Sequence, residues 1–153
     1  MPRSPKSDPQ REEVYRWEKG FRQQFFDHTM KTRAAQRLVR EIAEHFGVKR
    51  PRLFRTRLGK QGYTGAALEA EFIEVNTDRA EFTAILLAHE MAHVICAFEG
   101  LDEPDHGPVW LGTYLYLLDR FKIVPLCATV PSAKAAGLKF RPPEDCAPGK
   151  FPS

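Results

Sequence analysis

The sequence predicts a single α+β domain in which several helices accompany a small sheet. Apolar residues recur at helical spacing in four stretches, and two stretches between the second and the third alternate as strands do. The chain has 153 residues, 42% of them hydrophobic, which is enough to form one core. We therefore expect these helices and strands to pack together.

Four helices follow from the apolar periodicity. The first is predicted over residues 11–27 and the second over residues 33–45, with Gly47 as the C-cap of the second. The third is predicted within residues 82–98, an apolar run without Gly or Pro. The fourth is expected to begin at Pro108, because proline suits the first turn of a helix.

Two strands are predicted between the second and third helices. The first covers residues 52–58 and is followed by a Gly-rich turn or loop at 59–65. The second covers residues 66–75, with a bulge or two-sided burial where the alternation shifts. Thr77 or Asp78 is the expected N-cap of the helix that comes next.

The two ends of the chain are predicted to be less structured than its middle. We expect a disordered lead over residues 1–9, a domain over residues 10–130 and a Pro-rich extension over residues 131–153. Residues 131–137 are compatible with a short helix, and an extended, mobile end is expected from Arg141 onward.

The composition indicates a cytoplasmic or nucleoid-associated monomer with no membrane partner. No stretch is long and apolar enough to span a membrane, and the first ten residues lack the apolar region of a secretion signal. The three cysteines, Cys96, Cys127 and Cys146, are scattered, as is common in a reducing compartment.

The third helix carries a histidine and glutamate pattern that is typical of zinc hydrolases. His89-Glu90-Met91-Ala92-His93 places two imidazoles at positions i and i+4, on one face of a helix. They can bind one zinc ion at about 2.0–2.1 Å each. Glu90 can then deprotonate a water molecule at the metal, as the general base. The alternative, two core histidines bonded to the backbone, leaves Glu90 unexplained.

A catalytic zinc site needs a third protein ligand, and His106 is the nearest candidate. The metzincin pattern is excluded because Cys96 and Glu99 stand where that class has Gly and His. The segment from residue 99 to 108 is rich in Gly, Pro and acids and is predicted to be a loop. This loop would return His106 toward the third helix.

Three acidic residues are rival ligands. Glu99 follows the motif too closely to fold back easily, Glu103 lies in the predicted loop, and Asp119 is more remote. Asp105 is a candidate for orienting a ligand through a hydrogen bond rather than binding the metal itself.

The motif and its sequel resemble those of the SprT-like zinc metalloproteases, the Spartan-related family. Their signature is H-E-M-x-H followed by H-G-P and an aromatic residue, and here His106-Gly107-Pro108-Val109-Trp110 follows the motif. The resemblance implies that His89, His93 and His106 bind zinc and that Glu90 is the general base. It implies a zincin-like fold of the minigluzincin type. It also implies a role in DNA repair, in which the protease cleaves proteins trapped on DNA and depends on DNA for its activity.

Many bacterial members of that family also carry a zinc ribbon with paired C-x-x-C motifs. The cysteines of this chain are too few and too far apart for such a ribbon. We therefore expect one zinc ion and a catalytic domain without a ribbon. Any contact with DNA must then come from the domain itself or from a partner.

Charge is divided unevenly along the chain. Residues 1–60 hold 16 Lys/Arg and 7 Asp/Glu, net +9, and residues 61–153 hold 7 and 13, net −6, which together give +3. Such a basic half can attract phosphates without reading sequence, or it can simply be a solvated face. The candidate DNA-contacting residues are Arg33, Arg37, Arg40, Arg50, Arg52, Arg55, Arg57 and Lys60.

These observations leave three hypotheses about function. The first is a zinc-dependent peptidase acting on DNA-associated or DNA-crosslinked proteins. The second is a zinc peptidase with a regulatory or toxin-like role unrelated to DNA. The third is a non-catalytic, zinc-stabilised module that binds nucleic acid. For the two peptidase hypotheses, Tyr63, Tyr114 and Tyr116 are candidates for stabilising the oxyanion by residue type alone.

Overall fold

The protein is described here from a computed structural model, and its α+β class is confirmed. The structure describes residues 8–25, 28–56, 66–68, 72–76, 81–101 and 105–151. In this part of the chain it forms five α-helices, one 3-10 helix and a three-stranded sheet. No helix among these residues is both long and apolar enough to cross a membrane. The chain divides into two compact units, residues 27–99 and residues 1–26 with 100–153.

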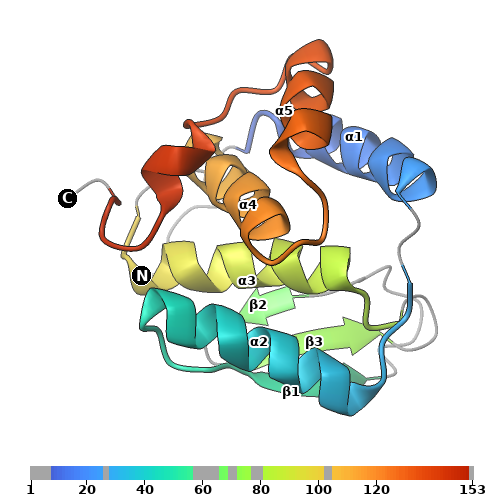
Figure 1. Ribbon diagram of the computed structural model, residues 1–153, viewed down its shortest axis with the longest axis vertical. Coiled ribbons are helices and arrows are strands. Elements are labelled where there is room, and N and C mark those ends of the chain that lie inside the picture. The colour runs from blue at the N-terminus through green and yellow to red at the C-terminus, as the bar shows by residue number, and fades with distance from the viewer. Residues whose placement is uncertain are drawn as a thin grey trace, which may run out of the picture. The chain divides into compact units, whose positions relative to one another are not determined.

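The unit of residues 27–99 contains the sheet and two helices. In chain order it has α2 (Thr32–Phe46), β1 (Arg52–Thr56), β2 (Ala66–Leu68), β3 (Phe72–Asn76) and α3 (Ala84–Phe98). The strand order is β1-β3-β2, with β1 parallel and β2 antiparallel to β3. Figure 1 shows α2 crossing in front of β1, and α2 also contacts α3.

Helix α2 forms as its sequence predicts. Its apolar residues share one buried stripe, and its polar residues face solvent. Gly47 ends the helix in the left-handed region at φ 66°, where its N–H reaches the carbonyls of Ala43 and Glu44. A glycine adopts this conformation without the steric cost that a side chain would add, so the predicted C-cap is confirmed.

The prediction of one strand over residues 66–75 is wrong. The structure has two strands, β2 and β3, which pair antiparallel. Ile73 and Val75 are buried on one face of β3, although the preceding alternation had placed apolar residues at even positions. The shift in alternation therefore marks a change of strand rather than a bulge. Residues 69–71 lie outside the described residues.

The predicted N-cap of the motif helix is also wrong. Helix α3 begins at Ala84, and its N-cap is Thr83, whose hydroxyl accepts a hydrogen bond from the Leu86 N–H at 3.1 Å. Phe82 is buried but not helical, because its carbonyl accepts a hydrogen bond from the Met30 N–H at 2.7 Å. The apolar run thus begins two residues before the helix does. Thr77 and Asp78 lie outside the described residues.

The other unit contains α1 (Arg11–Gln24), α4 (Pro108–Arg120), α5 (Leu126–Ala135) and the 3-10 helix η1 (Pro143–Cys146). Trp17 of α1 joins three of these helices. Its indole N–H donates to the Ser132 hydroxyl at 2.8 Å, and its ring lies edge-on to Tyr114 at 6.3 Å. Pro108 occupies the first turn of α4, as predicted.

The expectation of an extended, mobile end from Arg141 is wrong as far as residue 151. The Arg141 N–H donates to the Pro108 carbonyl at 2.9 Å, and Cys146 of η1 is fully buried. The prolines at 142 and 143 do not prevent this turn, because proline is tolerated at its start. The predicted short helix at 131–137 instead spans Leu126–Ala135, with Pro131 inside it.

The close approach of α4 to the C-terminal segment makes Gly112 a sensitive position. A Cβ at Gly112 would lie 2.4 Å from the Arg141 carbonyl oxygen and 2.8 Å from the Cys146 Sγ. We expect Gly112→Ala to lower the free energy of unfolding by about 1–3 kcal/mol. Gly20→Ala is the matched control, because a Cβ there meets nothing within 4 Å. It should raise stability by about 0.5–1 kcal/mol. Urea denaturation of both variants measures the difference, and equal effects would contradict the packing described here.

Candidate metal centre

Helix α3 places the two histidines of the motif together. His89 and His93 are one turn apart, and their ring centroids lie 5.1 Å from each other with the planes inclined at 63°. His89 is buried and His93 is half-buried. The helix is continuous from Ala84 to Phe98, so the spacing of the motif acts as predicted and brings both rings to one face.

Glu90 lies beside the first of these histidines and is also buried. Its side chain is only 4% exposed, and its Oε1 is 3.9 Å from the His89 Nε2. The neighbouring positions of α3 are apolar and almost fully buried. A cation bound by the adjacent imidazoles would interact favourably with this carboxylate.

His106 lies just before α4 and is held on several sides. Its exposed fraction is 4%, and its ring is edge-on to Trp110 at 4.7 Å and to Tyr15 at 5.1 Å. Its Nδ1 lies 2.7 Å from an Asp8 carboxylate oxygen, and its carbonyl accepts a hydrogen bond from the Gln10 side chain at 2.7 Å.

The three predicted ligands form a group that could hold a metal ion. One ring nitrogen from each of His89, His93 and His106 lies within 4.8 Å of the other two. The described residues contain no other group of three His, Cys, Asp or Glu side chains with this property. Three imidazoles are a ligand set that zinc accepts, and they leave a fourth position for water or substrate.

The acidic rivals of His106 do not join this group. Glu99 is exposed at the end of α3. Asp119 is also exposed and accepts a hydrogen bond from the Leu126 N–H at 3.2 Å, close to the start of α5. Glu103 lies outside the described residues. Asp105, predicted to orient a ligand, is exposed, and Asp8 makes that contact instead.

Asp8 and Gln10 were missed at the sequence level. Asp8 falls in the predicted disordered lead, which is wrong at this residue; residues 1–7 lie outside the described residues. Polar residues just before a predicted helix suggest only a helix cap. No local pattern connects them with a histidine 96 to 98 positions further along the chain.

The tyrosines considered for oxyanion stabilisation differ in their surroundings. Tyr114 is fully buried and stacks on Trp110 at a centroid distance of 5.3 Å. Burial raises the pKa of Tyr116 above its usual value, although Arg120 opposes the shift. Tyr116 therefore keeps its phenolic proton at neutral pH. Tyr63 lies outside the described residues.

The candidate DNA-contacting arginines are exposed wherever the structure describes them. Arg33, Arg37 and Arg40 share one face of α2, as their spacing predicts. Among the others, Arg50, Arg52 and Arg55 are exposed, and Arg57 and Lys60 lie outside the described residues.

Two of these arginines have acidic neighbours that reduce their net attraction for phosphate. Arg55 Nη1 lies 2.8 Å from Glu81 Oε2, and its guanidinium lies 4.6 Å from the centre of the Phe82 ring. Arg40 is 3.9 Å from Glu44. The Arg52 guanidinium lies 5.5 Å from the centre of the Phe54 ring. Arg33, Arg37 and Arg50 are consequently the stronger candidates for contacting a phosphate backbone.

No protein-family model, curated protein or solved structure compared with this chain matches it. The candidate metal centre is therefore supported by its own residues alone.

Proposed function

We propose that this protein is a zinc-dependent metallopeptidase that hydrolyses peptide bonds in proteins, with a SprT-like site. One observation carries the proposal. Three imidazoles have ligand atoms within 4.8 Å of one another, and a buried glutamate lies next to one of them in the sequence and in space. A purely structural zinc site has no use for that carboxylate, whereas peptide hydrolysis needs a base there.

In the proposed peptide hydrolysis, the metal and Glu90 have different roles. His89, His93 and His106 would hold the zinc ion, which would supply Lewis-acid chemistry toward a water molecule and a peptide carbonyl. Glu90 accepts the proton of the attacking water and then delivers it to the leaving amine. The burial of Glu90 keeps its carboxylate away from bulk water and next to His89, where the attacking water would lie.

We also propose that the fold is zincin-like, of the minigluzincin type. The support is the order of elements around the motif: a helix, a small sheet with one parallel pair, and then the motif helix α3. The sheet has two outer strands, β1 and β2, and an outer strand can pair with an extended peptide through its main chain. Such pairing would bind substrates with little dependence on their sequence.

The proposed substrates are proteins associated with or crosslinked to DNA, and the support is the exposed basic face of α2 with Arg50. A cleavage assay tests both parts of the proposal. The zinc-loaded protein is incubated with denatured casein in the absence of DNA, with single-stranded DNA and with duplex DNA, each with and without a chelator. We expect chelator-sensitive cleavage that DNA stimulates.

Other results of this assay would favour the alternatives. Cleavage of equal rate with and without DNA would favour a peptidase with a regulatory or toxin-like role. Zinc binding and DNA binding without any cleavage would favour a non-catalytic module. Zinc-independent cleavage would contradict the proposed chemistry itself.

The basic face gives a separate prediction about DNA affinity. Replacing Arg33, Arg37 and Arg50 together by Ala should weaken binding of single-stranded DNA and reduce its salt dependence. Each lost phosphate contact lowers the slope of log K against log salt by about 0.7. Replacing Arg16 and Arg120, two exposed arginines outside this face, by Ala is the control. Fluorescence anisotropy at several salt concentrations measures both variants, and an equal loss in the two would contradict a specific basic face.

A further inference from the structure

We propose that Asp8 and Gln10 are positioning residues that fix the ring and the backbone of His106, the third metal ligand. The inference rests on the proposed function only in taking His106 as a ligand. It assigns a role in preparing the metal site to two residues just before α1, of which Asp8 falls in the predicted disordered lead of residues 1–9 and Gln10 at the start of the predicted domain.

The Asp8 carboxylate determines which nitrogen of His106 can bind a metal. Asp8 Oδ2 lies 2.7 Å from the His106 Nδ1, and Asp8 Oδ1 accepts a hydrogen bond from the His106 N–H at 3.3 Å. An ionised carboxylate can only accept hydrogen bonds, so Nδ1 must carry the proton. The Nε2 atom then has the lone pair, which is the form in which a histidine coordinates zinc.

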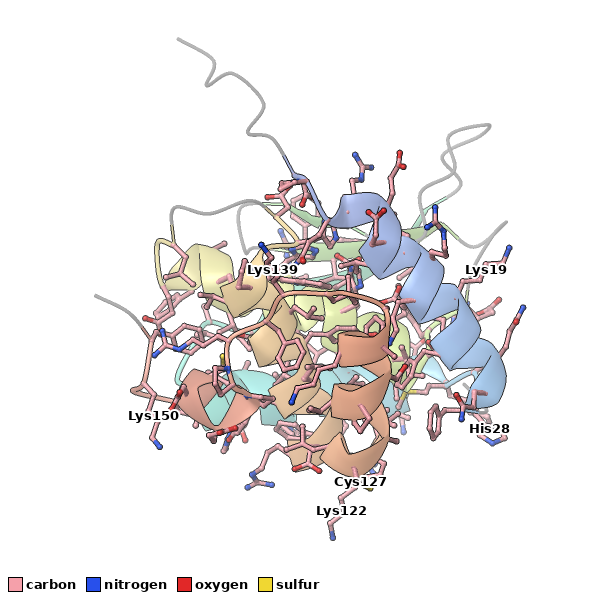
Figure 2. The ribbon with its side chains drawn as sticks, turned by 90° about the horizontal axis from the view of Figure 1, so that it is seen from above. Lys19, His28, Lys122, Cys127, Lys139 and Lys150 are labelled. Atoms are coloured by element: carbon pink, nitrogen blue, oxygen red, sulfur yellow. The ribbon has the colours of Figure 1, made fainter. Side chains whose placement is uncertain are left out.

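Gln10 fixes the backbone of the same residue. Its side-chain amide donates to the carbonyls of His106, at 2.7 Å, and Lys139, at 3.0 Å, and its oxygen accepts the Lys139 N–H at 3.1 Å. Gln10 thus joins the loop before α4 to the segment around Lys139, which is labelled in Figure 2.

Both residues are themselves held by the first turn of α1. The Asp8 carbonyl accepts the Arg11 N–H at 3.3 Å, and the Gln10 carbonyl accepts the Val14 N–H at 2.9 Å. The Asp8 side chain is only 15% exposed, so water competes weakly for its hydrogen bonds to His106. The position of His106 therefore depends on α1 through the side chains of Asp8 and Gln10.

Two aromatic rings also lie against the His106 ring. Trp110 and Tyr15 each lie edge-on to it, at 4.7 and 5.1 Å, and restrict its rotation. With Nδ1 held by Asp8, the ring has its binding orientation before any metal arrives. Such pre-orientation raises metal affinity, and the loss of a partner of this kind costs about 10–100-fold.

A merely structural role for Asp8, such as anchoring the chain end, would affect stability but not the protonation pattern of the His106 ring. The test therefore compares Asp8→Ala and Asp8→Asn with Asp105→Ala in the full chain. Asp105→Ala is the matched control, because this substitution also removes one negative charge, but from an exposed residue next to His106. Nitrogen-15 NMR of the zinc-free proteins identifies the tautomer of His106, and competition with a chromophoric chelator measures zinc affinity.

We expect His106 to carry its proton on Nδ1 in the wild type and in Asp105→Ala. Asp8→Ala should shift the proton toward Nε2 and bind zinc about 10–100-fold more weakly. Asp8→Asn has one acceptor oxygen for the two N–H groups of His106, so it should weaken zinc binding by less than Asp8→Ala does. Unchanged tautomer and affinity in Asp8→Ala would overturn the inference.

The two readouts separate this inference from the proposed function. If the wild type bound no zinc, the proposed function would fail, while the tautomer would still decide the role of Asp8. If Asp8→Ala did not fold, the wild type would remain informative: a proton on Nε2 of His106 there would refute the assignment.

Discussion

Glu90→Gln should retain its zinc and lose proteolysis by about 10²–10⁴-fold, the usual contribution of a general base. Glutamine has nearly the same shape as glutamate, so the packing around this buried position changes little. Its amide cannot take a proton from water, however, so the attacking nucleophile is no longer generated. The measurements are the initial rate of casein cleavage and the zinc content of the same preparation.

The control for this variant is Glu12→Gln, an exposed glutamate in the first turn of α1. It changes the net charge equally and should cleave at the wild-type rate. If Glu90→Gln cleaved as fast as Glu12→Gln, Glu90 would not be the base. If it lost its zinc together with its activity, Glu90 would be acting on the metal rather than on water.

His93→Ala should lower zinc affinity by more than about 100-fold. Removing a residue that only hydrogen-bonds a metal ligand costs about 10–100-fold, and removing the ligand itself should cost more. His93 is the better choice for this test, because it is half-buried whereas His89 is buried, so truncation leaves a smaller cavity. Proteolysis should disappear with the metal. Competition with a chromophoric chelator measures the affinity, and circular dichroism verifies the helix content.

The matched control here is His28→Ala, since His28 is an exposed histidine in the described part of the chain and is labelled in Figure 2. It should bind zinc as the wild type does. Equal zinc affinities in His93→Ala and His28→Ala would exclude His93 as a ligand. The spacing of the motif would then have arisen by chance and would not indicate metal binding.

The parts of the site that lie on one helix could be predicted from the sequence. His89, Glu90 and His93 are fixed by the geometry of α3, whose spacing holds wherever the helix is continuous. The C-cap at Gly47 and the helix start at Pro108 are equally local, because each depends on the backbone preferences of a single residue.

The features that depend on distant partners could not be predicted. The sequence contains several residues able to cap α3, and only the hydrogen bond from Leu86 identifies Thr83. The separation of β2 from β3 depends on their antiparallel pairing, which alternation alone does not encode.

The roles of Asp8 and Cys146 also could not be predicted from the sequence, because both depend on distant partners. Asp8 gains its role from a residue 98 positions away, and Cys146 is buried against α4 despite the prolines before it. Low apolar content and prolines near a terminus therefore predicted disorder where long-range contacts provide structure.

The ion pairs within the basic face also could not be predicted from the sequence. Arg55 was expected to act with its neighbours on phosphate, but its ion pair with Glu81 and its position over Phe82 occupy its guanidinium. Counting basic residues therefore overestimates the charge available to DNA, and Arg33, Arg37 and Arg50 are better tests of that contact.

Zinc K-edge X-ray absorption of the zinc-loaded full chain directly tests the proposed metal centre, because it reports the identity and the number of ligand atoms. We expect one zinc ion per chain with three imidazole nitrogens at about 2.0–2.1 Å and one oxygen ligand. The spectrum of His106→Ala should show one imidazole fewer. Sulfur ligands at about 2.3 Å, or a wild-type spectrum with only two imidazoles, would contradict the proposed centre.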